Sequence, residues 1–447
     1  MSGHIFGRHT KGNLPTVLAG DGVWLIDSEN NHYLDGCGGA AVSVLGHSNS
    51  HVLQAAKDQL DRIAFAHTGF FTSEPAEKLA DKLISLAPKG IERVYLVSGG
   101  SEAVEASIKL ARQYFIEIGQ PKRAKIISRW QSYHGNTLGA LATGGNKWRR
   151  AQYEPLLADA MHHIDPCHFW RWAEGGESAF DYGQRMANQL EEKILELGAE
   201  TVAGFFVEPV VGATMGAVPA VKGYFKRIRE ICDTYGVLLI FDEVMCGAGR
   251  TGTFFASEQE DVVPDMVCLA KGLGAGIQPI GAMLCSATIY DAIKVGSGFF
   301  TNGHTYMGHS VAAATGLAVL EEIEQQGLLR NVTQMGSLLG NRLNAQFGQH
   351  PFVGNIRGRG LFYGIELVAD KETKVPFDAS LGLNSKVKKA AMGEGLMCYP
   401  GGGTVDGKNG DHILLAPPYI VNEENVEMIV DRLSVALDKA LKEIGFS

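Results

Sequence analysis

Short apolar stretches alternate with amphipathic stretches from His51 onward. The apolar stretches are strand-like: VYLV (94–97), KIIS (125–128), FFVE (205–208), VLLIFDE (237–243) and MVCL (266–269). Between them, residues 76–86 and 102–118 repeat apolar residues at helical spacing. This alternation predicts an α/β fold with a mostly parallel sheet flanked by helices. Such sheets bind ligands beyond the carboxyl ends of their strands, so we expect functional residues there.

The length of the chain predicts more than one packing unit, because 447 residues exceed the roughly 250–300 at which single cores stop growing. The pattern changes toward the C-terminal end. Helices are expected over 316–326, 331–347 and 423–444, strands over 356–368 and 412–420, and a loop over the Gly-rich residues 401–410. A strand pair within 22–35 is expected to fold against these elements. We therefore predict a large α/β domain over 51–329 and a small α+β domain formed by 1–50 and 330–447.

Charge and cysteine content disfavour several classes of partner. The chain has 40 Lys and Arg against 49 Asp and Glu, a net charge of -9, which disfavours nucleic acid and anionic membranes. No stretch approaches the ~18 apolar residues of a membrane span, and residues 1–18 lack the apolar core of a signal peptide. The 7 cysteines form no Cys-x-x-Cys pair, so we expect reduced thiols and no metal site. These features predict a cytoplasmic protein with a small-molecule ligand.

A glycine-rich turn joins the strand at 94–97 to the helix expected from Glu102, in the motif VSGGSEAVEASIKLAR (97–112). The free N–H groups and positive dipole end of a helix N-terminus favour an anion, and glycine lets a phosphate approach the backbone closely. Gly100 and Ser101 are therefore candidate phosphate ligands. Alternatively, Ser101 is an ordinary N-cap of the helix.

Two further strand ends carry reactive side chains. In VLLIFDEV (237–244), an apolar run ends at Asp242, which needs a cation or a protonated heterocycle as partner unless it only caps the next loop. Its neighbour Glu243 is expected to make a loop or dimer contact. Lys271 follows another apolar strand and enters a glycine-rich bend, where desolvation makes its amine a nucleophile for an aldehyde. One loop and one strand fit between Asp242 and Lys271, so both side chains can reach one crevice.

Motifs along nearly the whole chain resemble, in order, those of the class III, or omega-type, aminotransferases. They are SGGSEAVEASIKLAR (98–112), SYHGNTLGALATGG (132–145), FFVEPV (205–210), LLIFDEVMCGAGRTG (238–252), CLAKGLGAG (268–276), HTYMGHSVAAA (304–314) and LAPPYIV (415–421). The resemblance implies a pyridoxal 5'-phosphate (PLP) enzyme of fold type I, with a mostly parallel, seven-stranded type of sheet in the large domain and a smaller α+β domain. It also implies a homodimer, or a tetramer, with active sites at the subunit interface.

The resemblance assigns roles to residues around the cofactor ring. Lys271 matches the lysine that holds PLP as a Schiff base and then moves the substrate's α-proton. Asp242 matches the carboxylate that pairs with the pyridine nitrogen. Tyr133 and Val244 match the side chains on the two faces of the ring, although ordinary core packing would also explain both.

Other matched residues lie near the phosphate and the phenolic oxygen. Gly100 and Ser101 match the phosphate-binding turn. Thr305 resembles the threonine that reaches the phosphate from the neighbouring subunit, and Glu208 resembles the acid near the phenolic side of the cofactor. All of these roles are implied by the resemblance.

The substrate-binding residues depart from the family patterns. Ornithine-like members carry an arginine directly after YHG, where this chain has Asn136. Many amine:pyruvate members carry an arginine shortly before the strand that leads to APP, where this chain has Gly407 and Lys408. Lys408 is a candidate anion ligand or a solvated loop lysine, and it lacks the planar fork that binds a carboxylate through two hydrogen bonds. Arg359 is a second candidate.

The implied activity is transfer of an amino group from an amine or omega-amino acid donor to a small keto acid such as pyruvate, in ping-pong half-reactions. A PLP-dependent lyase or racemase is the alternative, because these enzymes share deprotonation of the α-carbon. A non-catalytic binding protein is a more remote alternative, which leaves Lys271 and Asp242 without an explanation.

Overall fold

The computed structural model describes residues 4–8, 10, 12 and 14–446. A mixed seven-stranded sheet lies at its centre. In spatial order its strands are β4 (Ile91–Val97), β12 (Gly281–Ser286), β11 (Met266–Leu269), β10 (Leu238–Asp242), β7 (Val202–Val207), β5 (Lys125–Arg129) and β6 (Met161–Ile164). Strand β12 is antiparallel to both neighbours, and the remaining pairs are parallel. The predicted α/β fold with a mostly parallel sheet is confirmed.

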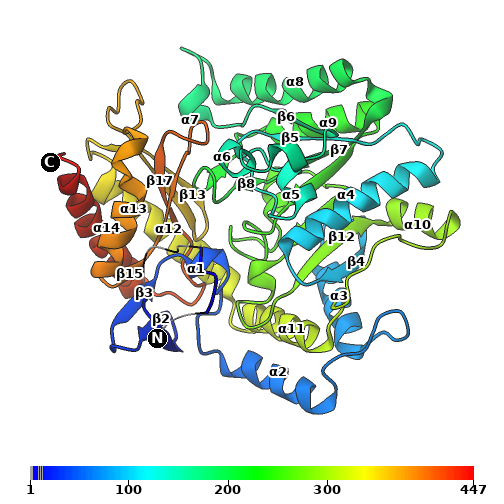
Figure 1. Cartoon of the computed structure of the whole chain (residues 1–447), viewed down its shortest axis with the longest axis horizontal. Helices are drawn as coiled ribbons and strands as arrows, with labels where there is room; N and C mark the ends of the chain where they lie inside the picture. Colours follow the sequence, from blue (N-terminus) through cyan, green and yellow to red (C-terminus); the bar gives the residue numbers. More distant parts are fainter. Residues whose placement is uncertain (1–3, 9, 11, 13, 447) are drawn as a thin grey trace.

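Helices pack on both faces of this sheet because its strands are apolar on both sides. The surrounding helices are α2 (Ser50–Arg62), α3 (Glu74–Leu86), α4 (Gly100–Glu117), α8 (Ala179–Leu197), α9 (Tyr224–Tyr235), α10 (Ala287–Val295) and α11 (Ser310–Gln325) (Figure 1). In β10, Leu239 and Phe241 pack with α8 and α9. Ile240 points the other way and packs with α4. The helices cover both faces of the sheet, so polar side chains lie at the ends of the strands.

Elements from both ends of the chain fold together on the side of α12, α13 and α14 in Figure 1. They are β1 (Val17–Asp21), β2 (Trp24–Asp27), β3 (His32–Asp35), α12 (Leu328–Phe347), β13 (Val353–Arg359), β14 (Phe362–Leu367), α13 (Leu383–Gly393), β15 (Leu396–Met397), β16 (Tyr399–Gly402), β17 (Asp411–Leu415) and α14 (Glu423–Glu443). Strand β15 pairs with β3, so the N-terminal strands do fold against C-terminal elements. The domain boundaries near residues 50 and 330 stay a prediction.

Three C-terminal predictions need correction. The single strand expected over 356–368 is a hairpin of β13 and β14, because the chain turns at Gly360, whose φ of 55° favours glycine. The strand expected over 412–420 ends at Leu415, since Pro417 and Pro418 have no N–H to donate to a ladder. The loop expected over 401–410 begins only after Gly402, the last residue of β16.

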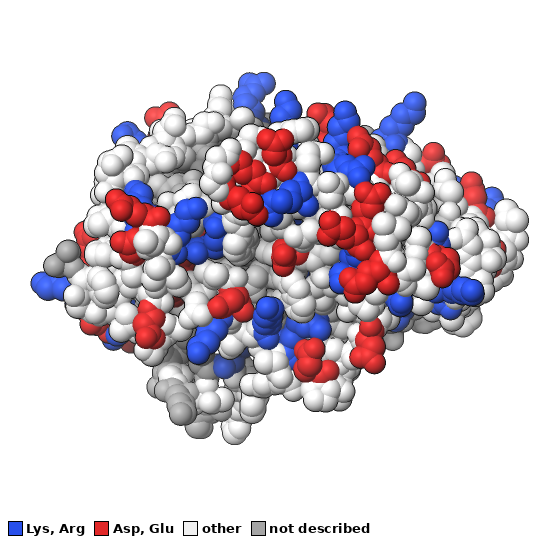
Figure 2. All heavy atoms as spheres, turned by 90° about the horizontal axis from the view of Figure 1, so that it is seen from above, with Lys and Arg blue, Asp and Glu red and all other residues white. Residues whose placement is uncertain are grey.

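The remaining elements are short. They are α1 (Gly38–Ala41), α5 (Leu138–Thr143), α6 (Lys147–Arg150), α7 (Phe169–Trp172), β8 (Val210–Val211), β9 (Val218–Pro219) and the 3-10 turns Glu154–Leu156, Ala199–Thr201, Ala256–Glu260, Lys271–Leu273 and Ala379–Leu381. All seven cysteines are buried and free, as predicted. Within the described residues, no helix has the length and apolarity that crossing a bilayer requires. Acidic and basic side chains are interspersed on the face in Figure 2.

Candidate active site

The strand ends of the central sheet surround a cavity of about 400 Å³, here called the inner cavity. Seven residues singled out from the sequence line it: Gly100, Ser101, Tyr133, Glu208, Asp242, Val244 and Lys271. They lie at or just beyond the carboxyl ends of β4, β5, β7, β10 and β11, which share one edge of the sheet. This edge is where a doubly wound sheet binds its ligand.

Lys271 enters the inner cavity from a strained backbone. Strand β11 ends at Leu269, and Lys271 then adopts a φ of 44°, in the left-handed region that non-glycine residues rarely occupy. Burial lowers the pKa of its amine, and the negative charges of Asp242 and Glu208 oppose that shift. Desolvation therefore favours the neutral, nucleophilic amine at this position. The backbone strain is consistent with a side chain held in place for chemistry.

Asp242 has a protein partner that the sequence reasoning missed. The Nδ1 atom of His134 lies 2.8 Å from its Oδ2, and the Val244 N–H donates to its Oδ1 at 3.0 Å. His134 is buried and packs edge-on against Phe206, with ring centroids 4.9 Å apart. Its place directly after Tyr133 in the YHG motif was the only sequence signal. The predicted need of Asp242 for a partner is thus met on one side by an imidazole.

Two buried carboxylates accept backbone hydrogen bonds near the cavity. Glu208 accepts from the N–H groups of Tyr133 and Gly212 at 3.0 and 2.9 Å, and burial raises the pKa of its carboxyl. Glu243 instead points away and accepts from the N–H groups of residues 256 and 257. Burial raises the pKa of Glu243 to about 7. Of the loop and dimer contacts expected for Glu243, the loop contact is present.

The start of α4 forms one wall of the inner cavity. Gly99 is the N-cap, so Ser101 lies within the first turn, and the alternative of Ser101 as N-cap is wrong. The Ser101 hydroxyl accepts the Asn136 N–H at 3.0 Å. A Cβ placed on Gly100 would come within 2.8 Å of Val244 Cγ1, so a side chain there would clash with the opposite wall. Glycine keeps the helix N-terminus open to the cavity.

Three predicted residues lie outside the inner cavity. Thr305 is exposed, in the segment between α10 and α11. Arg359 forms an ion pair with Glu260, whose side chain is 5% exposed, so its charge is already compensated and it does not line the cavity. Lys408 lines a second, neighbouring cavity. The structure therefore brings the ring candidates together with Gly100 and Ser101, and it leaves Thr305, Arg359 and Lys408 outside this cavity.

Comparisons with known proteins agree with this geometry. The family model Aminotransferase class-III matches residues 7–437. An uncharacterized aminotransferase of Schizosaccharomyces pombe is 43% identical over 94% of this chain and 92% of its own length. A diaminobutyrate–2-oxoglutarate transaminase of Halomonas elongata is 33% identical over 95% and 90%. The omega transaminase of Pseudomonas jessenii in complex with PMP superposes with a TM-score of 0.92 at 33% identity, covering 98% of this chain and 97% of that one.

Proposed function

The chain belongs to the class III aminotransferases, and we propose that it moves an amino group from an amine or omega-amino acid donor to a small keto acid such as pyruvate. It is a PLP-dependent transaminase. When bound, PLP supplies an aldehyde that takes up amines and a ring that withdraws electrons from the substrate's α-carbon. One observation carries the assignment: Lys271 and Asp242 line the same cavity, and the pKa of Lys271 is lowered by burial.

The residues of the inner cavity fit this cofactor. Gly100 and Ser101 would offer N–H groups at the start of α4 to the phosphate, and the Cβ clash at Gly100 supports a close approach to the backbone. Buried Asp242 would hold the proton on the ring nitrogen, because an opposite charge in a low-dielectric site favours the charged form. Val244 and Tyr133 would cover the two ring faces.

Lys271 is the residue that would exchange protons with the substrate. Its amine would hold PLP in the inner cavity through the cofactor's aldehyde group, and burial favours the neutral form of that amine. As a neutral amine, Lys271 would take the proton from the substrate's α-carbon and later give a proton back, acting as general base and then general acid. The keto acid would reverse these steps in a second half-reaction. Glu208 would lie on the phenolic side of the ring, and Thr305 would act on the phosphate of the partner subunit.

A spectral experiment separates transamination from its alternatives. We expect an amine donor alone to change the visible absorption of the holoenzyme, and the change to persist until pyruvate or 2-oxoglutarate is added. A lyase or racemase would return to the starting spectrum without a keto acid. Turnover measured with a panel of donors against both keto acids would then identify the preferred pair.

A further inference from the structure

A second cavity of about 740 Å³, here called the outer cavity, adjoins the inner one, and Ala213 lines both. Four cationic side chains line the outer cavity: Arg8, Arg149, Lys388 and Lys408. No Asp or Glu is among its described lining residues. Within the described part of the chain, none of the four cations forms an ion pair within 4.0 Å. The outer cavity is therefore positively charged and suited to an anion.

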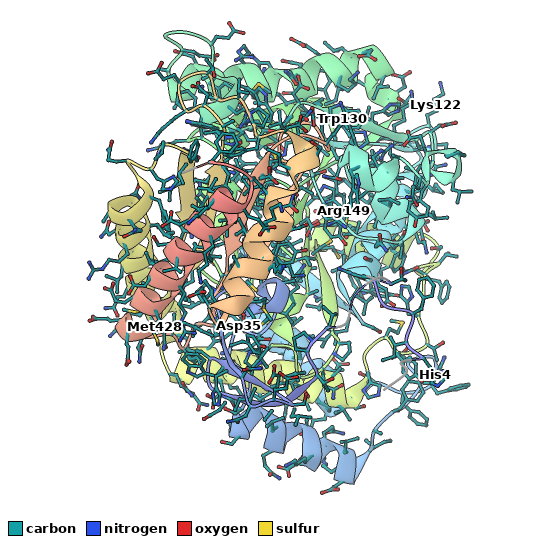
Figure 3. All side chains as sticks on the ribbon, turned by 60° about the vertical axis from the view of Figure 1, so that its left-hand side comes forward. His4, Asp35, Lys122, Trp130, Arg149 and Met428 are labelled. Atoms are coloured by element: carbon teal, nitrogen blue, oxygen red, sulfur yellow. The ribbon has the colours of Figure 1, made fainter. Side chains whose placement is uncertain are left out.

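Arg149 occupies the inner end of the outer cavity. Its short helix α6 is capped by the Asn146 side chain, which accepts the Arg149 N–H at 3.1 Å. The guanidinium carbon lies 4.8 Å from the centroid of the Tyr133 ring, and Tyr133 lines the inner cavity. In Figure 3, Arg149 lies beside α13, the helix that contributes Lys388 to the outer cavity. Tyr133 thus holds the guanidinium at the boundary between the two cavities.

Within the described residues, the guanidinium of Arg149 lacks the hydrogen-bond acceptors that the guanidinium of Arg150 has. Arg150 is buried, and its Nη1 donates to the carbonyl oxygens of Ala142 and Gly144. Arg149 is half-buried, and its guanidinium donates to no acceptor among the described residues. The Arg149 guanidinium is planar, stacks on Tyr133 and has N–H groups without an acceptor in the described part of the chain. This arrangement suits a carboxylate, which accepts two parallel hydrogen bonds from a guanidinium.

The charge of Arg149 also acts on the reactive lysine. It contributes to the lowered pKa of Lys271, although burial is the largest cause. Lys408, by contrast, lies in an exposed loop near Asp378, the pKa of which it helps to lower. Arg149 is therefore the cation of the outer cavity with the most direct influence on the inner one.

We propose that the Arg149 guanidinium binds the anionic end of the substrate, so that this enzyme prefers donors whose carboxylate is separated by several carbons from the reacting amine. The inference rests on the proposed transamination and adds the residue that selects the donor. The amine would lie at Lys271 in the inner cavity, and the carboxylate would extend past Tyr133 to Arg149. The exposed cations Arg8, Lys388 and Lys408 would add a field that attracts anionic substrates.

The test compares two donors of equal length, 5-aminopentanoate and pentylamine, with the holoenzyme and pyruvate. We expect Arg149→Gln to lower kcat/KM for 5-aminopentanoate by roughly tenfold or more, since charged bidentate hydrogen bonds are among the strong ones. The value for pentylamine should change by less than about threefold, because that donor has no carboxylate to bind and burial, rather than Arg149, is the largest cause of the lowered pKa of Lys271. Arg149→Lys should fall between, and Arg330→Gln, at an exposed arginine of α12, is the matched control.

A binding measurement makes the result independent of turnover. Pentanoate, which has the carboxylate but no amine, should bind the wild-type and Arg330→Gln holoenzymes equally and the Arg149→Gln holoenzyme roughly tenfold more weakly by calorimetry. Equal loss of kcat/KM for both donors, or unchanged pentanoate binding, would overturn the role of Arg149. Absence of keto-acid-dependent turnover in the wild-type enzyme with every donor would instead overturn the proposed function, while the pentanoate result would still report on the anion site.

Discussion

His134 Nδ1 lies 2.8 Å from Asp242 Oδ2, although 108 positions separate the two residues in the chain. His134 follows β5 and Asp242 ends β10, and β7 lies between these strands in the sheet. Both side chains are buried, so little solvent screens the contact. The imidazole thereby holds the carboxylate in one orientation, and its own position is set by the packing against Phe206.

We predict that His134→Phe weakens catalysis without unfolding the chain. Phenylalanine keeps the contact with Phe206 but removes the hydrogen bond to Asp242, so the carboxylate is no longer held in one orientation toward the ring nitrogen. We expect about a tenfold or larger loss in kcat, with PLP still bound. The measurement is the pH dependence of the cofactor's visible absorption. An unchanged pH dependence would mean that His134 only fills space.

Asp242→Asn should leave PLP bound and slow removal of the α-proton. A neutral amide cannot hold a proton on the ring nitrogen, so the electron-withdrawing power of the ring falls. A loss of a few kcal/mol in transition-state stabilisation corresponds to about a hundredfold or more in rate. Single-turnover rates with an amine donor measure this step directly. Rates equal to those of the wild type would show that the ring-nitrogen role is wrong, and Asp242→Glu, which keeps the charge, serves as the comparison.

Lys271→Ala should abolish transamination and leave a folded protein. The variant loses both the covalent attachment of PLP and the amine that moves the proton. Borohydride treatment of the wild-type holoenzyme should fix the cofactor to the peptide that contains Lys271, as mass spectrometry can detect. Near-normal turnover by the variant, or label on another lysine, would end the assignment.

Thr305 is predicted to act on the cofactor of the other subunit. A hydroxyl that donates to a phosphate is worth ~1.5–3 kcal/mol, so Thr305→Ala should weaken PLP retention about tenfold or more. The decisive experiment mixes inactive Lys271→Ala subunits with inactive Thr305→Asp subunits. A hybrid dimer with shared sites places both defects in one site and leaves the other intact, so activity should reappear. Hybrid formation without recovered activity would contradict the shared site.

We predict that protonation of His168 lowers the free energy of unfolding in mild acid. Its Nε2 lies 3.1 Å from Glu366 Oε2, in a buried group that also holds Arg171 and Arg357. Burial, together with the positive charge of Arg357, lowers its pKa to about 4 from 6.5.

The lowered pKa of His168 determines how the free energy of unfolding changes with pH. A histidine whose folded pKa is depressed stabilises the fold above pH 6.5, and that stability is lost as the pH falls toward 4. Between pH 7 and 5 the loss for His168 alone is about 2 kcal/mol in the free energy of unfolding. We expect His168→Gln, which keeps a donor toward Glu366, to remove this part of the pH dependence. Denaturant titrations of both holoenzymes at equal concentration measure it, and parallel pH dependences would show that His168 does not titrate in this range.

Local pattern in the sequence predicted the central sheet and most of its reactive strand ends. The apolar run 238–241 is buried on both faces, and a parallel sheet gathers the carboxyl ends of such strands at one edge. Lys271 and Asp242 were therefore expected in one crevice before their partners were known. The cytoplasmic location and the dimer stay predictions.

Tertiary structure decided which polar groups are already satisfied and which still face a cavity. Arg359 is a plausible anion ligand in the sequence, but the fold pairs it with Glu260, which lies 99 positions away. Arg149 lies outside the motifs that predicted the site, and the fold places its guanidinium over the ring of Tyr133. The sequence carries apolar periodicity, which is local and repeats, whereas the pairing of charges depends on which distant loops meet. Only the packed chain brings those loops together.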